Sequence, residues 1–194
     1  MDQDVVQKSA AITACLDRNS LVKESSILTS YVEKNSRFTY NDLLSEIPLL
    51  GLDGEPGNSL FISSKKISHD HRLLVKNNIK TVISVCENKK KQRILDNYAA
   101  HGISNYHFAI DDCESENISE IFPETDPLIE ESLKKGGVLV HCRAGISRSA
   151  TVVLEYLLYS KKFLDLKSAV DHLLEIRPEI CPNPAFIRQL LEYQ

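Results

Sequence analysis

This chain has no long hydrophobic run, and its cysteines lack the spacing of a paired motif. No stretch of about 18 apolar residues occurs, and no charged-then-apolar start, so the sequence predicts neither a membrane span nor a signal peptide. The five cysteines are odd in number and form no Cys-x-x-Cys pair, which argues against a disulfide framework and a zinc site. We therefore expect a protein of a reducing compartment, cytoplasmic or also nuclear, with no metal ion or other cofactor.

A strong excess of charge is also lacking. The net charge is −4 and the isoelectric point is about 5.9, which argues against a nucleic-acid-binding surface as the main function. Hydrophobic residues make up 42% and charged residues 26% of the 194 positions, as is usual for a globular chain with one core. We expect no nucleic-acid or membrane partner.

Glycine is scarce, and its distribution suggests a boundary. Three of the seven glycines and one proline lie in the segment 51–58, which is the clearest linker in the sequence. It separates a helical extension and linker, residues 1–57, from one domain, residues 58–194. Within the extension, apolar residues recur at helical spacing at 27, 28, 31 and 32, and Asn41 could cap a second helix carrying Leu43, Leu44 and Ile47. We expect these helices to pack on the domain; a separate docking module is the alternative.

After the linker, strand-like and helix-like patterns alternate. Strands are predicted at 59–63, 80–86, 104–110 and 137–141, and helices at 67–77, 89–101, 118–135, 148–161, 166–176 and 184–193. This order predicts an α/β fold with a central, mostly parallel sheet flanked by helices on both faces. Ligands of such sheets bind at the carboxyl ends of the strands.

The segment 141–150 lies at one such strand end and contains the most informative pattern. Cys142 and Arg148 are six positions apart on a turn between a buried strand and a helix. At a helix N-terminus, unpaired backbone N–H groups and the helix dipole attract an anion. The same field favours the thiolate form of a cysteine. The turn therefore predicts a phosphate-binding site with a nucleophilic sulfur.

Each residue of this turn has a suitable chemistry. Cys142 would attack phosphorus, and the planar guanidinium of Arg148 would hold two phosphate oxygens. Gly145 allows a close backbone approach, Ser149 can donate its hydroxyl to the sulfur, and His141 would order the loop. The phosphate-binding backbone comprises Arg143, Ala144, Gly145, Ile146, Ser147 and Arg148. The alternative is an inert buried cysteine beside a hydrogen-bonded histidine, which the strand-turn-helix context disfavours.

With these residues, the chain resembles the cysteine-dependent dual-specificity protein phosphatases, in particular their MAP-kinase-phosphatase-like branch. Residues 141–149 match the family signature His-Cys-x-x-Gly-x-x-Arg-Ser, and segments at 59–64, 78–85 and 177–190 resemble its other conserved parts. The resemblance spans about residues 58–194 and implies the protein-tyrosine-phosphatase-like fold. Two positions depart from it: Ser63 replaces a common glycine and Ser84 a common asparagine, both outside the catalytic loop.

A phosphate ester also needs a proton for its leaving oxygen, which a carboxylic acid can supply. Asp111 and Asp112 follow a predicted strand. In the family the acid precedes an asparagine like Asn117 with four residues between them, which selects Asp112 and leaves Asp111 as a neighbour. A helix-capping turn is the alternative reading of this acidic pair.

The resemblance implies hydrolysis of phosphotyrosine and phosphoserine or phosphothreonine through a cysteinyl-phosphate intermediate, without a cofactor. The partner would be a phosphorylated protein, for which a MAP kinase is a candidate. Two alternatives remain. One is a phosphatase acting on a non-protein phosphate, such as a phosphoinositide or RNA; the other is a scaffold that recognises phosphate without turnover.

Two further features stay open. Cys86 ends a predicted strand, and some lipid phosphatases of the superfamily carry a cysteine at this position that can trap the oxidised nucleophile. Cys113 is the competing candidate for this role. The alternative is that Cys86 is only a packed cysteine at the end of a strand. The basic run Lys89-Lys90-Lys91-Gln92-Arg93 opens a predicted helix. It lies either at the rim of the phosphate site or on a solvated helix face.

Overall fold

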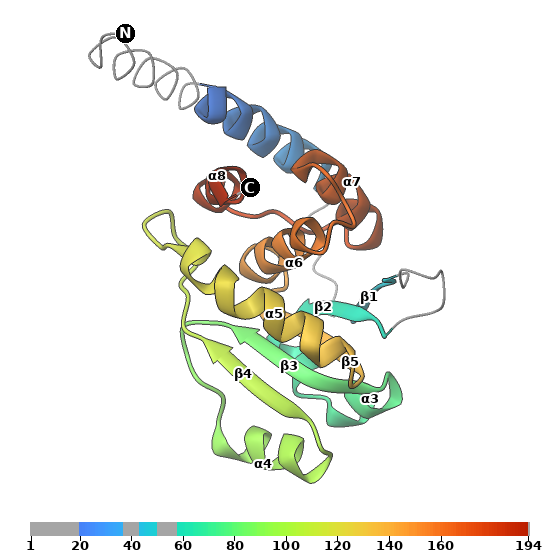
Figure 1. Cartoon of the computed structure of the whole chain (residues 1–194). Helices are drawn as coiled ribbons and strands as arrows, with labels where there is room; N and C mark the ends of the chain where they lie inside the picture. The colour runs from blue at the N-terminus through green and yellow to red at the C-terminus, as the bar shows by residue number, and fades with distance from the viewer. Residues whose placement is uncertain (1–19, 37–42, 50–57, 194) are drawn as a thin grey trace, which may run out of the picture.

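A five-stranded sheet organises the molecule (Figure 1). The computed structural model describes residues 20–36, 43–49 and 58–193. The strands run in the order β1 (Ser45–Ile47), β2 (Leu60–Ser64), β5 (Gly137–Cys142), β3 (Ile79–Val85) and β4 (Ser104–Phe108). All neighbouring pairs are parallel except β1 and β2. The predicted mostly parallel sheet is confirmed.

Helices cover both faces of this sheet, as predicted (Figure 1). One face carries α5 (Phe122–Leu133), α6 (Arg148–Tyr159), α7 (Leu166–Ile176) and α8 (Pro184–Tyr193). The other carries α2 (Lys65–Ser68), α3 (His71–Lys76) and α4 (Gln92–Ala100). No helix in the described ranges is long and apolar enough to cross a membrane.

Two hydrophobic cores result, one on each side of the sheet. Within β5, Val138 and Val140 join the core under α5 to α8, whereas Leu139 joins the core under α3 and α4. This alternation follows from the two-residue period of a strand. All residues of β5 are buried, so the strand that ends at Cys142 is held firmly in the middle of the sheet.

Within residues 20–36 and 43–49, which the structure describes, the N-terminal extension forms one helix and one strand. The helix over residues 20–35 buries Leu28 and Val32 against the α6 to α8 side of the molecule. The predicted second helix is wrong where the structure describes it, because Ser45–Ile47 forms β1 and pairs with β2. Leu44 packs on one core and Ile47 is buried in the other. A strand at the sheet edge places each of these residues against its own core, which a short helix would not do. Asn41 and the linker residues 51–57 lie outside the described residues.

Some predicted helices begin or end differently. The segment predicted as a helix at 67–77 divides into α2 and α3, because the side chain of Asp70 accepts a hydrogen bond from Leu73 N at 3.1 Å and starts a new helix. The segment 118–135 begins with a 3₁₀ turn, η1 (Ile118–Ile121), before α5. Gly102 follows α4 with φ +66, the left-handed conformation that favours glycine.

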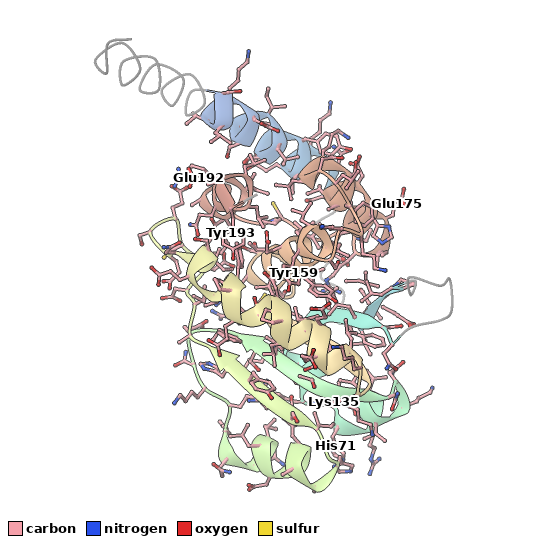
Figure 2. The ribbon with its side chains drawn as sticks, viewed as in Figure 1. His71, Lys135, Tyr159, Glu175, Glu192 and Tyr193 are labelled. Atoms are coloured by element: carbon pink, nitrogen blue, oxygen red, sulfur yellow. The ribbon has the colours of Figure 1, made fainter. Side chains whose placement is uncertain are left out.

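Two carboxyl groups, Asp126 on α5 and Glu155 on α6, are buried close enough to affect each other electrostatically. Asp126 is 1% exposed and Glu155 4%, and within the described residues Asp126 Oδ1 and Glu155 Oε2 have no hydrogen-bond partner. Glu155 lines a cavity together with Tyr159 and Tyr193. Both tyrosines are labelled in Figure 2. Burial, together with the charge of Glu155, raises the pKa of Asp126 to about 8, and burial raises the pKa of Glu155 to about 7.

These carboxyls predict a fold that is less stable at alkaline pH. Their folded-state pKa values lie above the unfolded values of about 4, so the native state binds more protons between about pH 4 and 8. The free energy of unfolding should therefore fall as pH rises through this window, by up to about 1.4 kcal/mol per pH unit for each group. Urea unfolding from pH 5 to 8 should show a shallower fall in Asp126→Asn. The exposed Glu124→Gln should keep the wild-type slope, and equal slopes in all three proteins would contradict this account.

Candidate active site

The loop between β5 and α6 surrounds the sulfur of Cys142 with donors. The Gly145 N–H lies 3.1 Å from Cys142 Sγ, and the Ser149 hydroxyl donates to the same atom from 3.2 Å. Cys142 is 1% exposed and ends β5, while Arg148 begins α6. Donors aimed at a sulfur at a helix N-terminus favour its anionic form. The structure thus brings together Cys142, Gly145 and Ser149 as the sequence suggested.

The carbonyl groups of this loop point away from the sulfur and bond to surrounding elements. Backbone N–H groups donate to three of them, over distances of 2.9–3.2 Å. The pairs are Lys65 N to Arg143 O, Cys181 N to Ile146 O, and Thr151 N to Ser147 O. Because C=O and the next N–H lie on opposite sides of a planar trans peptide, outward carbonyls leave N–H groups facing inward.

Arg177 completes this support from the end of α7. It is 1% exposed, and its guanidinium donates to Gly145 O at 2.8 Å and to Ala144 O at 3.4 Å. The same group reaches Leu43 O at 3.2 Å and Ser45 Oγ at 3.1 Å. Arg177 therefore ties the loop to β1. The sequence marked this residue only as part of the family's closing segment.

Gly145 is required at its position. Its φ is +74, and a Cβ atom there would lie 2.6 Å from the backbone carbonyl of Ser63. Both the left-handed backbone and the close approach exclude larger residues.

Arg148 is oriented by two acidic residues. Its Nη1 donates to Glu87 Oε2 at 2.6 Å and to Ile110 O at 3.0 Å, and its Nε lies 3.5 Å from Asp112 Oδ2. Arg148 Nε is buried and has no hydrogen-bond partner within the described ranges, which leaves it available to a phosphate oxygen. The sequence analysis missed Glu87. A backbone N–H of Glu87 and the Arg148 guanidinium lower its pKa, so it remains ionised.

Asp112 lies against the same loop. Its Oδ1 accepts hydrogen bonds from Ser147 Oγ at 2.6 Å and from Asn183 Nδ2 at 3.1 Å. The backbone N–H of Asn183 also donates to Ser147 Oγ, at 3.2 Å. Asp111 is exposed. Asn183, which the sequence analysis did not single out, thus holds Asp112 beside Arg148.

His141 lies behind the loop, in contact with Lys90. His141 is fully buried, and its Nε2 is 2.7 Å from Lys90 Nζ and 2.8 Å from Ser84 Oγ. Lys90 is 9% exposed, so neither interpretation of the basic run, a phosphate-site rim or a solvated helix face, describes this residue. Burial and the charge of Lys90 hold the pKa of His141 well below its usual range, and burial lowers the pKa of Lys90 to about 8.

Cys86 emerges on the same sheet edge as Cys142. It follows β3, which pairs with β5 so that Ser84 lies opposite His141, and it is 2% exposed. Burial, and then the proximity of Cys142, raise the pKa of Cys86 to about 11. Cys113 is exposed, with its sulfur 3.3 Å from Ser115 Oγ.

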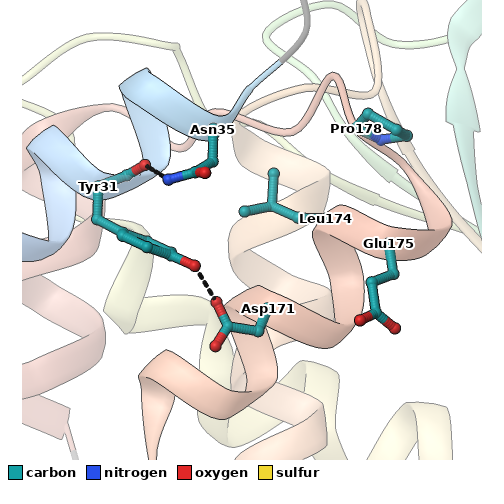
Figure 3. A pocket seen from close by; sticks show the side chains of 6 residues that line it. All are labelled: Tyr31, Asn35, Asp171, Leu174, Glu175 and Pro178. Atoms are coloured by element: carbon teal, nitrogen blue, oxygen red, sulfur yellow. Dashed lines mark hydrogen bonds between the residues drawn. The ribbon is translucent and has the colours of Figure 1, made fainter.

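A cavity elsewhere does not contribute to this site. A cavity of about 440 Å³ lies between the helix over residues 20–35 and α7, and the Tyr31 hydroxyl there donates to Asp171 Oδ1 at 2.7 Å. Figure 3 shows the side chains that line it. Its lining residues are Tyr31, Asn35, Asp171, Leu174, Glu175 and Pro178. None of them belongs to the loop around Cys142.

The sulfur of Cys142 lies among hydrogen-bond donors at the start of α6 in an α/β fold, and comparison with known proteins identifies the family. The family described as "Dual specificity phosphatase, catalytic domain" matches residues 60–194, so the chain belongs to the dual-specificity phosphatases. This confirms the resemblance and the fold class.

Several relatives are similar over the same region. Dual specificity protein phosphatase 19 of Mus musculus is 37% identical over 136 residues, which cover 70% of this chain and 59% of the relative. MAP kinase phosphatase with leucine-rich repeats protein 3 of Dictyostelium discoideum is 46% identical over 91 residues, 45% of this chain and 10% of the relative. The crystal structure of DUSP15 superimposes with a TM-score of 0.65 at 26% identity, covering 79% of this chain and 88% of that one. The chain therefore spans only part of the length of these two curated relatives.

Proposed function

We propose that this protein is a dual-specificity protein phosphatase that hydrolyses phosphotyrosine and phosphoserine or phosphothreonine through a cysteinyl-phosphate intermediate. The observation that carries the proposal is the convergence of three groups on one sheet edge: the donor-lined sulfur of Cys142, the guanidinium of Arg148 and the carboxylate of Asp112. Membership of the dual-specificity phosphatase family supports the same reaction.

In the first step, the Cys142 thiolate attacks phosphorus, the S–P bond forms and the P–O bond to the substrate breaks. Arg148 and the inward N–H groups of residues 143–148 hold the equatorial oxygens, where charge accumulates. Asp112 gives its proton to the leaving oxygen. In the second step, Asp112 takes a proton from water, whose oxygen attacks phosphorus, and the S–P bond breaks. Ser149, bonded to the sulfur, stabilises the departing thiolate.

The proposed substrate is a phosphorylated protein, and a MAP kinase is a specific candidate. Support comes from relatives named MAP kinase phosphatases. A phosphoinositide, an RNA phosphate and non-catalytic phosphate recognition are the alternatives, which the assays below separate. The proposed location is the cytoplasm or also the nucleus, and it is supported by the free thiols of Cys86, Cys113, Cys142 and Cys181.

The first test replaces the nucleophile. Cys142→Ser should bind a phosphotyrosine peptide yet lose turnover, because a serine hydroxyl is a far weaker nucleophile than a thiolate at neutral pH. Arg148→Lys should also be severely impaired, since an ammonium cannot hold two oxygens in a plane. Steady-state kinetics on phosphopeptides, a phosphoinositide and a 5′-phosphorylated RNA would measure both the losses and the substrate class. A serine variant within about tenfold of the wild-type rate would remove Cys142 from this role.

The second test distinguishes the two neighbouring aspartates. Asp112→Asn should lower kcat for alkyl phosphates by about 10²–10⁴-fold, the usual range for general acid catalysis, and less for aryl phosphates with good leaving groups. Asp111→Asn, a matched change one residue away, should have a much smaller effect. A reversed ranking would show that the acid has been assigned to the wrong residue.

We also propose that Cys86 protects the oxidised nucleophile. Hydrogen peroxide would convert the Cys142 thiolate to a sulfenic acid; the sulfur of Cys86 would then attack it, forming an S–S bond and releasing water. The raised pKa of Cys86 keeps it a neutral thiol, so oxidation begins at Cys142.

Peptide mapping without reduction, after mild peroxide treatment, tests this pairing. We expect a Cys86–Cys142 crosslink and recovery of activity with dithiothreitol. In Cys86→Ser, the same treatment should inactivate irreversibly, with sulfinic or sulfonic acid at Cys142. A crosslink between Cys113 and Cys142, or only sulfonic acid in the wild type, would exclude Cys86 as the partner.

A further inference from the structure

Lys90 approaches the loop around Cys142 from behind, through its contact with His141. It lies outside the family signature, which covers residues 141–149. Its side chain is buried, and Nζ lies 2.7 Å from His141 Nε2 and 3.1 Å from Ser68 Oγ. The ring of Tyr98 lies 5.7 Å away and shields it from solvent. A lysine ammonium has three donors and no acceptor. His141 Nε2 must therefore accept the hydrogen bond from Lys90.

This contact settles which nitrogen of His141 carries the proton. With Nε2 as an acceptor, the proton of the neutral ring is on Nδ1, which lies 3.1 Å from Cys142 O and donates to it. The Ser84 hydroxyl alone would not fix the tautomer of His141, because a hydroxyl can either donate to Nε2 or accept from it. With Nε2 as an acceptor, the Ser84 hydroxyl at 2.8 Å donates to this nitrogen as well. In the opposite tautomer, a lone pair of Nδ1 would face the lone pairs of the Cys142 carbonyl.

We propose that Lys90 is a positioning residue for the phosphatase reaction, which acts by locking His141 in the Nδ1–H tautomer. The locked ring holds the Cys142 carbonyl outward. Because C=O and N–H lie on opposite sides of a planar peptide, the Arg143 N–H is then directed into the phosphate site. The catalytic consequence rests on the proposed function of Cys142, whereas the lock itself does not.

The lock depends on the charge of Lys90. A neutral amine has a lone pair and can accept from an Nε2–H group, so loss of the proton releases the constraint. Burial lowers the pKa of Lys90 to about 8, and the positive charge of Lys65 contributes to this. The ionisable groups around Lys90 come from four elements or their ends: His141, Lys65, His69, Cys86 and Tyr98. Cys86 and Tyr98, with pKa values of about 11 and 12, stay neutral near pH 8. The lock is present below about pH 8 and weakens above it.

Two measurements on the full chain test this inference together. The ¹⁵N shifts of His141, assigned by difference from a His141→Gln sample, report the tautomer from pH 6 to 10. The kcat/KM for a phosphotyrosine peptide is measured over the same range. The wild type should show the Nδ1–H signature up to about pH 8 and, above it, a steeper fall in kcat/KM than the Lys90→Met variant.

Two substitutions at Lys90 should separate the lock from a packing role. Lys90→Met, of similar length, should lose the signature at every pH and lower kcat/KM below pH 8 by about tenfold, less than the 10²–10³-fold loss on deleting a direct oxyanion donor. Its kcat/KM should show no additional steepening above pH 8. Lys90→Arg, which donates but does not deprotonate, should keep the signature and likewise show no additional steepening above pH 8.

Lys91→Met is the matched control, since it removes the same charge from the next, exposed residue and should leave both readouts unchanged. An unchanged His141 tautomer in Lys90→Met would overturn the inference while the phosphatase activity stands. A lost signature with an unchanged pH profile would overturn the catalytic role of Lys90. A chain with the expected tautomer shifts but no turnover would support the lock and refute the proposed function instead.

Discussion

The orientation of six consecutive peptide groups around Cys142 is the constraint on which the site depends. An anion site made of backbone N–H groups requires the carbonyls of residues 142–147 to face outward, where each buried oxygen needs a donor. Every one of these carbonyls has a donor in the structure. The donors, from residue 142 to residue 147, are His141 Nδ1, Lys65 N, Arg177 Nη2, Arg177 Nε, Cys181 N and Thr151 N. The surrounding elements therefore fix the loop in a conformation that can receive a phosphate.

The demand for outward donors also explains features distant in the sequence. Arg177 bonds two loop carbonyls and Leu43 O and Ser45 Oγ, so the same guanidinium fixes the loop and the start of β1. A buried arginine is unfavourable unless its donors are satisfied, and carbonyls from two segments satisfy them. The short strand β1 thus connects the N-terminal extension to the catalytic loop through one side chain.

Local patterns predicted the strand, turn and helix around Cys142, because a short apolar run, a glycine and a helical pattern lie within a few consecutive residues. Long-range contacts could not be read in the same way. Asn183 reaches Asp112 across 71 positions, and Lys90 reaches His141 across 51. In the sequence, Lys90 is one of three adjacent lysines, and only the packing of α2 and α4 distinguishes the buried one from its exposed neighbours. β1 was missed because Ile47 and Leu44, the residue before the strand, pack on different cores, which a short sequence window cannot show.

Lys90 and Arg148, two buried cations near the loop, are compensated differently. Lys90 donates to the neutral groups His141 and Ser68, so its burial costs desolvation without an adjacent carboxylate to offset it. The pKa of Lys90 is lowered by the same burial. Arg148 differs, since the carboxylate of Glu87, 2.6 Å from its guanidinium, already balances its charge before a ligand arrives.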